Sequence, residues 1–261
     1  SPIYEPGINI LIKKNIRNCI KYENIRHNEL LKILVAKKER RKARSTIFRE
    51  SLARSLFYKL IAAGIFSTRA AKEVQPEYDA WLNRVGHYDT YINKMVVVLN
   101  KNLTGVSREV VRKLSRKVVA AEKMRVYRFT RDLIAELKKK NYFIVAISGS
   151  PYEIVRWYNR YLRFNRTYGS VMGVDKRGRY TGKLKYSYSV FDKRFLVQHV
   201  VEKYPVTLKG SVGVGDTEGD ISMLEMVDRP IAFNPSSGLY KVAKKRGGEI
   251  RVKRKDVVYK M

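Results

Sequence analysis

The chain of 261 residues contains a single cysteine, Cys19. One cysteine excludes an internal disulfide, and the absence of disulfides is typical of proteins from reducing compartments. Long apolar runs are also missing, because no stretch reaches the roughly 18 residues that a membrane span requires. The N-terminal residues lack the compact apolar segment of a signal peptide. We therefore expect a cytoplasmic protein that does not associate with membranes.

Acidic residues are scarce relative to basic ones. There are 24 Asp and Glu against 55 Lys and Arg, which gives a formal net charge of +31. A charge of this size attracts polyanions without specifying which one. Because the basic residues are spread along the whole chain, and because we find no RNA-recognition, zinc-finger or helix-turn-helix signature, we interpret them as solvated surface. Non-specific binding of nucleic acid is the alternative interpretation.

Aspartate is absent from the first part of the chain, where the first one is Asp79. Residues 1–45 are polar and basic. Within them, residues 29–44 (ELLKILVAKKERRKAR) are most simply a basic helix, and residues 33–36 are a candidate short strand. The hydrophobic content of 44% is enough for one sizeable α/β domain with a smaller insert.

Two kinds of pattern follow this basic segment. Residues 46–135 have helical periodicity; Leu52, Leu56 and Leu60, for example, share one helix face. Residues 142–235 alternate apolar strands with helices and include a predicted hairpin with its turn near 176–178. A further helix and a last short strand near 249–252 complete the chain. This alternation predicts an α/β fold: a doubly wound, mostly parallel sheet with helices on both faces and a helical insert.

The stretch VGVGDTEGDISML holds the strongest chemical signal. A short apolar strand delivers Asp216 to the carboxyl edge of a parallel sheet, where open α/β folds bind their ligands. Asp220 returns to the same point because Gly215 and Gly219 allow a tight loop. Two converging carboxylates are suited to Mg²⁺, which takes one or two carboxylates and keeps several waters. The alternative is that Asp220 caps the helix that follows.

The stretch VAISGSP places Ser148 at another strand end. Its hydroxyl, with the amides of Gly149 and Ser150, could hold an anion at the start of the next helix. An ordinary strand-to-helix turn with a serine cap is the alternative. Lys193 opens a later helix, and by itself it would be interpreted as a solvated surface lysine.

Taken together and in this order, the three stretches resemble the haloacid dehalogenase superfamily of phosphohydrolases. The likeness is to the phosphoserine-phosphatase-like branch with a helical cap (subfamily IB), and it extends from Thr46 to the C-terminus. AISGSP resembles the second family motif, Lys193 the third and GVGDTEGD the fourth. The resemblance implies a core of residues 46–55 and 136–261, a cap of residues 56–135 and a basic segment of residues 1–45 that is not family-like.

The resemblance implies Mg²⁺-dependent hydrolysis of a phosphomonoester, with a small phosphorylated metabolite as substrate. In that family an aspartate attacks the phosphorus, and a second aspartate two residues later protonates the leaving group. Carried over, Ser148 and Gly149 would bind phosphate and Lys193 would stabilise the phosphoaspartate. Asp216, together with Asp220, would position Mg²⁺, so that Lys193 and Asp216 are the expected catalytic residues.

The first family motif, an apolar strand followed by Asp-x-Asp-Gly-Thr, is not recognisable. Aligning Thr46 with the motif threonine places Lys42 at the nucleophile and Arg44 at the general acid. A lysine is not a phosphoryl-accepting carboxylate, and a guanidinium stays protonated at any working pH. Residues 37–42 (KKERRK) also cannot form a central strand, since unpaired buried charges cost several kcal/mol each. Either residues 33–36 replace that strand from a displaced position, or the sheet lacks its first strand.

Three explanations account for the missing motif. The chain is a pseudoenzyme, or residues up to about 45 come from a shifted reading frame or wrong gene start, or a carboxylate such as Glu39 replaces the nucleophile. We favour the second, because the resemblance stops abruptly at Thr46, whereas a decaying enzyme usually keeps the apolar strand that its fold needs. On any of them, turnover by the chain as written is expected to be impaired.

Overall fold

A computed structural model describes residues 32–37, 51–86, 88–186, 193–254 and 257–260. The helices are α2 (Leu52–Ala62), α3 (Arg69–Leu82), α4 (Tyr88–Leu103), α5 (Arg108–Glu122), α6 (Arg128–Lys139), α7 (Tyr152–Leu162), α8 (Lys193–Lys203), α9 (Ile221–Leu224) and α10 (Ser237–Lys245). The strands are β1 (Lys32–Lys37), β2 (Tyr142–Pro151), β3 (Arg166–Val174), β4 (Tyr180–Tyr186), β5 (Thr207–Gly215), β6 (Arg229–Phe233), β7 (Glu249–Arg254) and β8 (Val257–Lys260).

The strands described form one sheet in the order β4-β3-β2-β1-β5-β6-β7-β8. β2 is parallel to β3, and β5, β6 and β7 are parallel to one another. Since β1 is antiparallel to both β2 and β5, these five strands all run in the same direction. They end at one edge of the sheet, which we call the carboxyl edge. The predicted α/β fold with a mostly parallel sheet is confirmed.

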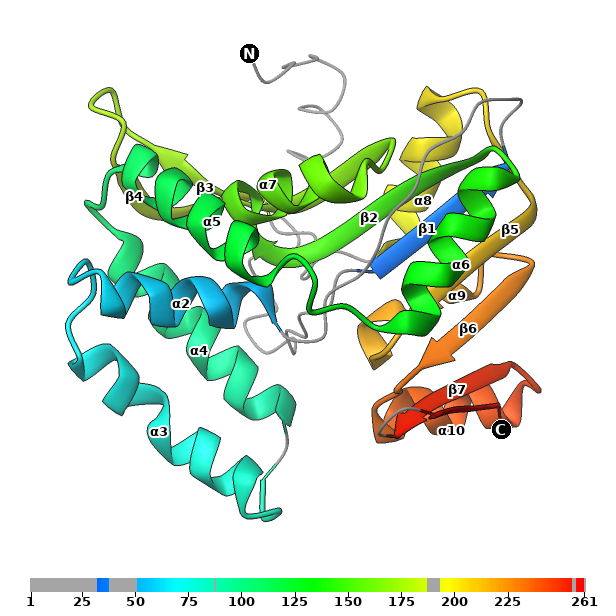
Figure 1. The fold of residues 1–261 in the computed structure, drawn as a ribbon, viewed down its shortest axis with the longest axis horizontal. Coiled ribbons are helices and arrows are strands. Elements are labelled where there is room, and N and C mark those ends of the chain that lie inside the picture. The colour runs from blue at the N-terminus through cyan, green and yellow to red at the C-terminus, as the bar shows by residue number, and fades with distance from the viewer. Residues whose placement is uncertain (1–31, 38–50, 87, 187–192, 255–256, 261) are drawn as a thin grey trace.

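The central position of the sheet is occupied by β1, which lies between β2 and β5 (Figure 1). The predicted basic helix is therefore wrong for residues 32–37, and the alternative of a short strand over residues 33–36 is confirmed. This segment has four consecutive apolar residues between two lysines, the composition that a central strand requires. The strand that replaces the family's first strand thus comes from a displaced position in the sequence.

The direction of β1 is the unexpected feature of the fold. Lys32 lies opposite Ile147 near the carboxyl edge, whereas Lys37 lies opposite Tyr142 and Thr207, at the start of β2 and β5. At about 3.3 Å per residue, the two ends of β1 are about 17 Å apart. The chain therefore leaves β1 at the edge opposite to the one where a parallel first strand would deliver its catalytic residues.

Helices cover both faces of the sheet, and β2 shows why. Its residues alternate between two apolar cores: Ile144 and Ala146 face one, while Phe143, Val145 and Ile147 face the other. The first core contains residues of α2 to α7, and the second contains residues of α8, α9 and α10. The sheet is thus a buried layer between two sets of helices, as Figure 1 shows.

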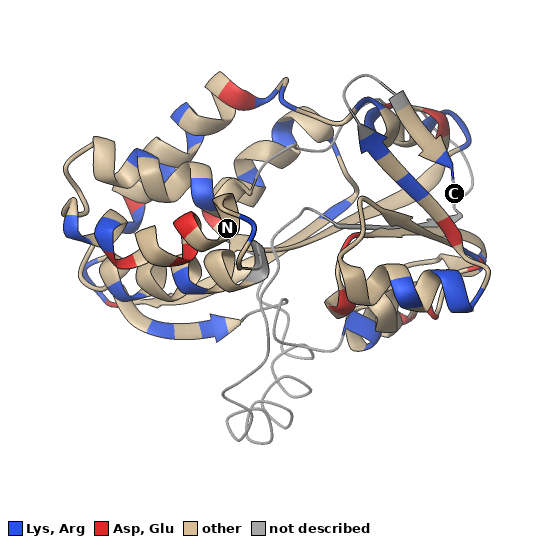
Figure 2. Cartoon of the chain, turned by 90° about the horizontal axis from the view of Figure 1, so that it is seen from below, with Lys and Arg blue, Asp and Glu red and all other residues tan. Residues whose placement is uncertain are grey.

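The helices α2 to α5, which we call the helical block, share a continuous core with the first face of the sheet. The connection between α4 and α5 also pairs with the β3–β4 hairpin, where the Gly105 amide donates to the Tyr180 carbonyl and the Arg108 amide donates to the Gly178 carbonyl. The predicted hairpin is confirmed, and its turn is fixed by Asp175, whose side chain accepts from two turn amides. Lysine and arginine occur both in the helical block and in the rest of the molecule (Figure 2).

The central place of β1 gives a test of the sheet. Val35 lies between Ile144 and Val212 in the middle of the sheet, so Val35→Pro removes one ladder hydrogen bond there. We expect the free energy of unfolding, measured by urea titration, to fall by at least about 1–3 kcal/mol, the cost of one buried unpaired carbonyl. The control is Lys260→Pro at the end of β8, which pairs with β7 alone. Equal losses for the two variants would contradict the central position of β1.

Candidate active site

The loop that follows β5 is organised around the carboxylate of Asp220, which is completely buried. Its Oδ1 lies 2.6 Å from Nζ of Lys193. Its Oδ2 accepts hydrogen bonds from the amides of Asp216 at 3.0 Å and Thr217 at 3.1 Å. With Thr217 it forms a capping box for the short 3₁₀ turn Glu218–Asp220. The alternative prediction, that Asp220 caps the helix that follows, is wrong: Asp220 precedes α9, but its side chain makes no cap hydrogen bond to that helix.

Gly215 and Gly219 lie on either side of the loop in which the backbone passes close to Asp220 and Lys193. A Cβ atom at Gly215 would lie 2.5 Å from the Cβ of Asp220, so a residue with a side chain would push the carboxylate away. Gly219 lies beside the end of Lys193, whose Nζ would be 3.9 Å from an added Cβ. Of the two glycines predicted to permit a tight return of the chain, Gly215 is therefore required by the closeness of Asp220, whereas the contact at Gly219 is an ordinary van der Waals distance.

Lys193 is buried, with 5% of its side chain exposed, and it is the first residue of α8. Its prediction as a helix-opening residue is confirmed, but the interpretation as a solvated lysine is wrong. A buried ammonium group needs a paired carboxylate, and Asp220 supplies it. Because Asp216 is the residue that follows β5 and is itself buried, the structure brings Lys193, Asp216 and Asp220 together.

Ser148 and Gly149 lie near the end of β2, at the same carboxyl edge. Ile147 and Val214 flank β1 at adjacent positions, so the ends of β2 and β5 are two inter-strand spacings, or about 10 Å, apart. The hydroxyl of Ser148 is buried and accepts the Ser150 amide at 3.1 Å. The serine cap predicted as an alternative is wrong, because Pro151 occupies the cap position of α7 and no side chain caps that helix. Ser148, Lys193, Asp216 and Asp220 therefore all lie at the carboxyl edge. They form two groups, with Ser148 at the end of β2 and the other three around the loop after β5.

The hydroxyl of Ser150 is not among the side chains predicted from the sequence. Ser150 is 1% exposed, and its Oγ has no hydrogen-bond partner among the described residues. An unpaired buried hydroxyl costs about 1–3 kcal/mol, so a residue of this kind at a site edge is itself a candidate functional residue. The signal in the sequence is its position two residues after Ser148, which places both side chains on one face of β2.

A partly buried ion pair joins the helical block to this edge. Glu153, in the first turn of α7, is 7% exposed and accepts a hydrogen bond at 2.9 Å from Nε of Arg108, which is 39% exposed. Burial alone would lower the pKa of Arg108, but the hydrogen bond to Glu153 and the surrounding charges together outweigh burial and raise that pKa. Arg108 is the first residue of α5, so the pair fixes the block against the helix that begins directly after Ser150 and Pro151.

The carboxylates at this edge only partly match a Mg²⁺ site. Asp216 and Asp220 are the two predicted ligands, and both oxygens of Asp220 already accept bonds from Lys193 and the loop. Glu218 in the same loop is hydrogen-bonded to Ser236 at 2.8 Å. No group of three His, Cys, Asp or Glu side chains that could hold a metal occurs among the described residues. To hold Mg²⁺, Asp220 would therefore have to share one of the oxygens that already bind Lys193 and the loop.

The first-motif positions Lys42, Arg44 and Thr46 lie outside the described residues, as does Glu39. What the structure does show is where the chain leaves β1. Lys37 is at the edge where β2 and β5 begin, about 17 Å from the carboxyl edge. A carboxylate placed directly after β1 would therefore lie at the edge where β2 and β5 begin. A carboxylate placed after a parallel first strand would instead lie at the carboxyl edge, beside Ser148 and Asp216.

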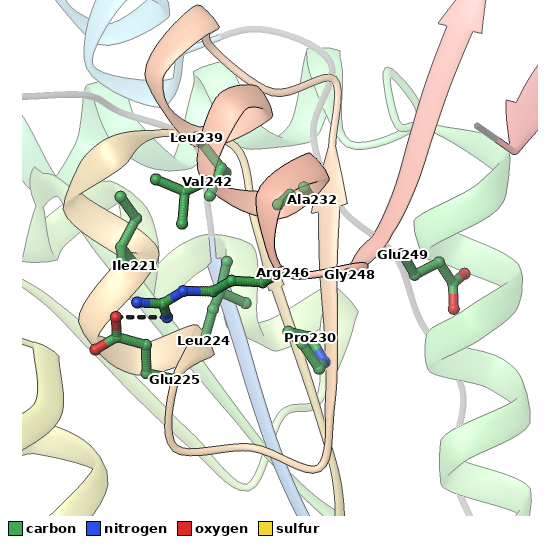
Figure 3. Close-up of a pocket in the computed structure, with 11 residues that line it drawn as sticks. Ile221, Leu224, Glu225, Pro230, Ala232, Leu239, Val242, Arg246, Gly248 and Glu249 are labelled. Atoms are coloured by element: carbon green, nitrogen blue, oxygen red, sulfur yellow. Dashed lines mark ion pairs between the residues drawn. The ribbon is translucent and has the colours of Figure 1, made fainter.

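A small hollow of about 60 Å³ lies beyond β5, between α9, β6 and α10 (Figure 3). It is mainly apolar, and Arg246 spans it to form an ion pair with Glu225 at 2.6 Å. None of the predicted site residues lines it.

No helix among the described residues is long and apolar enough to cross a membrane.

Comparison with solved structures places this fold among known ones. A protein of unknown function from Bordetella pertussis Tohama I has a TM-score of 0.62 and 16% identity, covering 78% of this chain and 93% of that one. A substrate-bound phosphoserine phosphatase complex has a TM-score of 0.52 and 19% identity, covering 78% and 91%. A phospho-aspartyl intermediate analogue of phosphoserine phosphatase has a TM-score of 0.51 and 20% identity, covering 77% and 87%. These likenesses show a shared fold.

No curated protein sequence matches the chain. A family model described as haloacid dehalogenase-like hydrolase does match, over residues 45–225. The match begins after β1 and includes Ser148, Lys193, Asp216 and Asp220. Because it spans more than half of the sequence and agrees with the fold, the chain belongs to the haloacid dehalogenase-like hydrolase family.

Proposed function

We propose that the chain is a phosphatase-type hydrolase domain that acts on the phosphomonoester of a small metabolite, with the helical block as its cap. The observation that carries the proposal is the buried Lys193–Asp220 pair in the loop beside Asp216, on the same sheet edge as Ser148. A buried cation next to helix and loop amides is suited to the negative charge of a phosphoryl group.

In this proposal each side chain has a separate task. Ser148 and the Gly149 amide bind phosphate oxygens, and Lys193 neutralises the charge that develops on them. Asp216, with Asp220, would hold Mg²⁺, which when bound would supply further charge neutralisation. Asp220 also has the structural task of holding Lys193 and the two loop amides. Substrate choice falls to the helical block, which Arg108 and Glu153 fix against α7.

Because the nucleophile of the first family motif is not recognisable, we expect low activity. Lys42 and Arg44 cannot supply a phosphoryl-accepting carboxylate and a general acid, so turnover is impaired. The start of the family match at residue 45 and the reversed direction of β1 both support a front segment that does not derive from the family. We keep the shifted reading frame as the explanation.

Asp216→Asn tests the hydrolase proposal directly. Phosphate release from an aryl phosphate, followed with and without Mg²⁺, is expected to be slow, dependent on Mg²⁺ and reduced at least tenfold in the variant, because one ligand carboxylate is lost. Asp228→Asn, which changes an exposed aspartate outside this loop, is the matched control. Release that does not respond to Mg²⁺ or to Asp216→Asn would contradict the proposal.

Lys193→Met tests the structural task of the buried ion pair. We expect unfolding free energy to fall by about 3–5 kcal/mol, since Asp220 is left as an uncompensated buried charge. Arg194→Met, the control, removes a half-exposed cation paired with Glu225 and should cost less than about 1 kcal/mol. In urea titrations the double variant Lys193→Met with Asp220→Asn should be more stable than Lys193→Met alone. Similar small losses for both single variants would refute a buried pair.

The reading-frame explanation can be checked on the gene itself. Translation of the other two frames upstream of the Thr46 codon is expected to give an apolar strand followed by Asp-x-Asp-Gly. DNA sequencing of this region, with restoration of the frame, should then give a chain with much faster phosphate release. If neither frame encodes that motif, the explanation is wrong and the pseudoenzyme explanation replaces it.

A further inference from the structure

Helices α5 and α7 pack against each other on the outside of the molecule (Figure 1). Each directs its apolar residues inward: Val111, Leu114 and Val118 of α5 are buried, as are Val155 and Tyr158 of α7. Their outward side chains are mostly cationic. The exposed ones, which we call the α5–α7 basic face, are Arg112, Lys113, Arg116, Lys117, Arg156, Arg160 and Arg163.

Acidic side chains offset little of this charge. The single acid of α7, Glu153, is buried against Arg108 and does not reach the surface. In α5, Glu109 pairs with Arg112 at 3.2 Å, and Glu122 pairs with Arg125 beyond the face. Arg116, Lys117, Arg156 and Arg160 form no ion pair with any described residue, so the centre of the face is uncompensated positive charge.

Trp157 brings two of these cations close together. The guanidinium of Arg160 lies 4.5 Å from the centre of its ring, and that of Arg116, from the other helix, lies 5.9 Å from it. Both contacts are cation–π interactions, which hold the planar groups in place. Like charges held near one ring repel each other, and an anion that contacts both would remove this repulsion. A guanidinium group can donate two parallel hydrogen bonds to two oxygens of one phosphate, which favours phosphate as that anion.

We propose that the α5–α7 basic face binds the phosphate backbone of nucleic acid without sequence preference. A membrane surface is the less suitable partner, because an interfacial helix inserts an apolar side into lipid, and the apolar sides of α5 and α7 are already buried in the core. A duplex instead offers closely spaced phosphates along a line. Helix rise and inter-helix spacing make the face about 15–20 Å across, enough for about four phosphates.

This proposal is independent of the hydrolase function. None of the seven side chains belongs to the candidate active site, and the face extends along α7 away from its first turn at Glu153. The basic residues elsewhere on the surface provide a matched control, because they carry the same charge on other helices. Lys139 of α6 and Lys241, Lys244 and Lys245 of α10 are all exposed.

The experiment compares two variants of the full chain that each lose four positive charges. The face variant carries Arg116→Gln, Lys117→Gln, Arg156→Gln and Arg160→Gln, and the control variant carries Lys139→Gln, Lys241→Gln, Lys244→Gln and Lys245→Gln. Binding to a labelled duplex of mixed sequence, about 20 base pairs long, is measured by fluorescence anisotropy from about 50 to 200 mM salt. Thermal unfolding verifies that both variants fold, and sedimentation with phosphatidylserine vesicles tests the membrane alternative.

For the unaltered chain we expect the logarithm of the binding constant to fall with the logarithm of salt concentration with a slope of about −3 to −4. The face variant should bind about 10- to 100-fold more weakly and lose most of this slope, while the control variant should bind within about threefold of the parent. Equal weakening in both variants would overturn the proposal in favour of diffuse net charge. Absence of duplex binding by the parent at low salt, or binding to vesicles alone, would overturn it as well.

Discussion

The buried ion pair between Lys193 and Asp220 is the interaction on which the carboxyl edge depends. It joins the first residue of α8 to the loop after β5, two segments that are 27 residues apart in the sequence. Neither charge could be buried alone, because the cost of removing either from water is several kcal/mol. The same carboxylate also accepts two loop amides, so one side chain sets the position of the lysine and the path of the backbone around Asp216.

This arrangement gives Asp220 two tasks that compete for the same oxygens. As a loop anchor it is satisfied by Lys193 and the amides, and as a metal ligand it would have to share an oxygen with the cation. Asp216 is tied to the rest of the edge through its main-chain carbonyl, which accepts the Ser236 amide at 2.7 Å. The chemistry of the edge therefore depends on how the two aspartates divide structural and ligand roles.

The central strand sets a second constraint. A position between two buried strands requires apolar residues and a complete ladder of hydrogen bonds, and Lys32–Lys37 meets that requirement in the antiparallel direction. The direction of the strand decides which of its ends lies at the carboxyl edge. A parallel strand would end beside Ser148 and Asp216, whereas β1 begins there. A sheet can thus be completed by a strand that cannot deliver a nucleophile.

The sequence alone predicted the helical stretch that begins near residue 50 and the alternation of strands and helices that follows it, because apolar periodicity and turn residues are local properties. It did not predict β8. It did predict that Ser148, Asp216 and Asp220 lie at the carboxyl ends of apolar strands, since small residues and carboxylates in that position carry their own signal, whereas Lys193 was predicted only through the family resemblance. It did not show that Lys193 is buried, because burial depends on Asp220 approaching from another segment. Nor did it show the direction of β1, the unpaired Ser150 hydroxyl or the pairing of Arg108 with Glu153. Those features result from contacts between segments distant in sequence, and only the packing of the tertiary structure decides them.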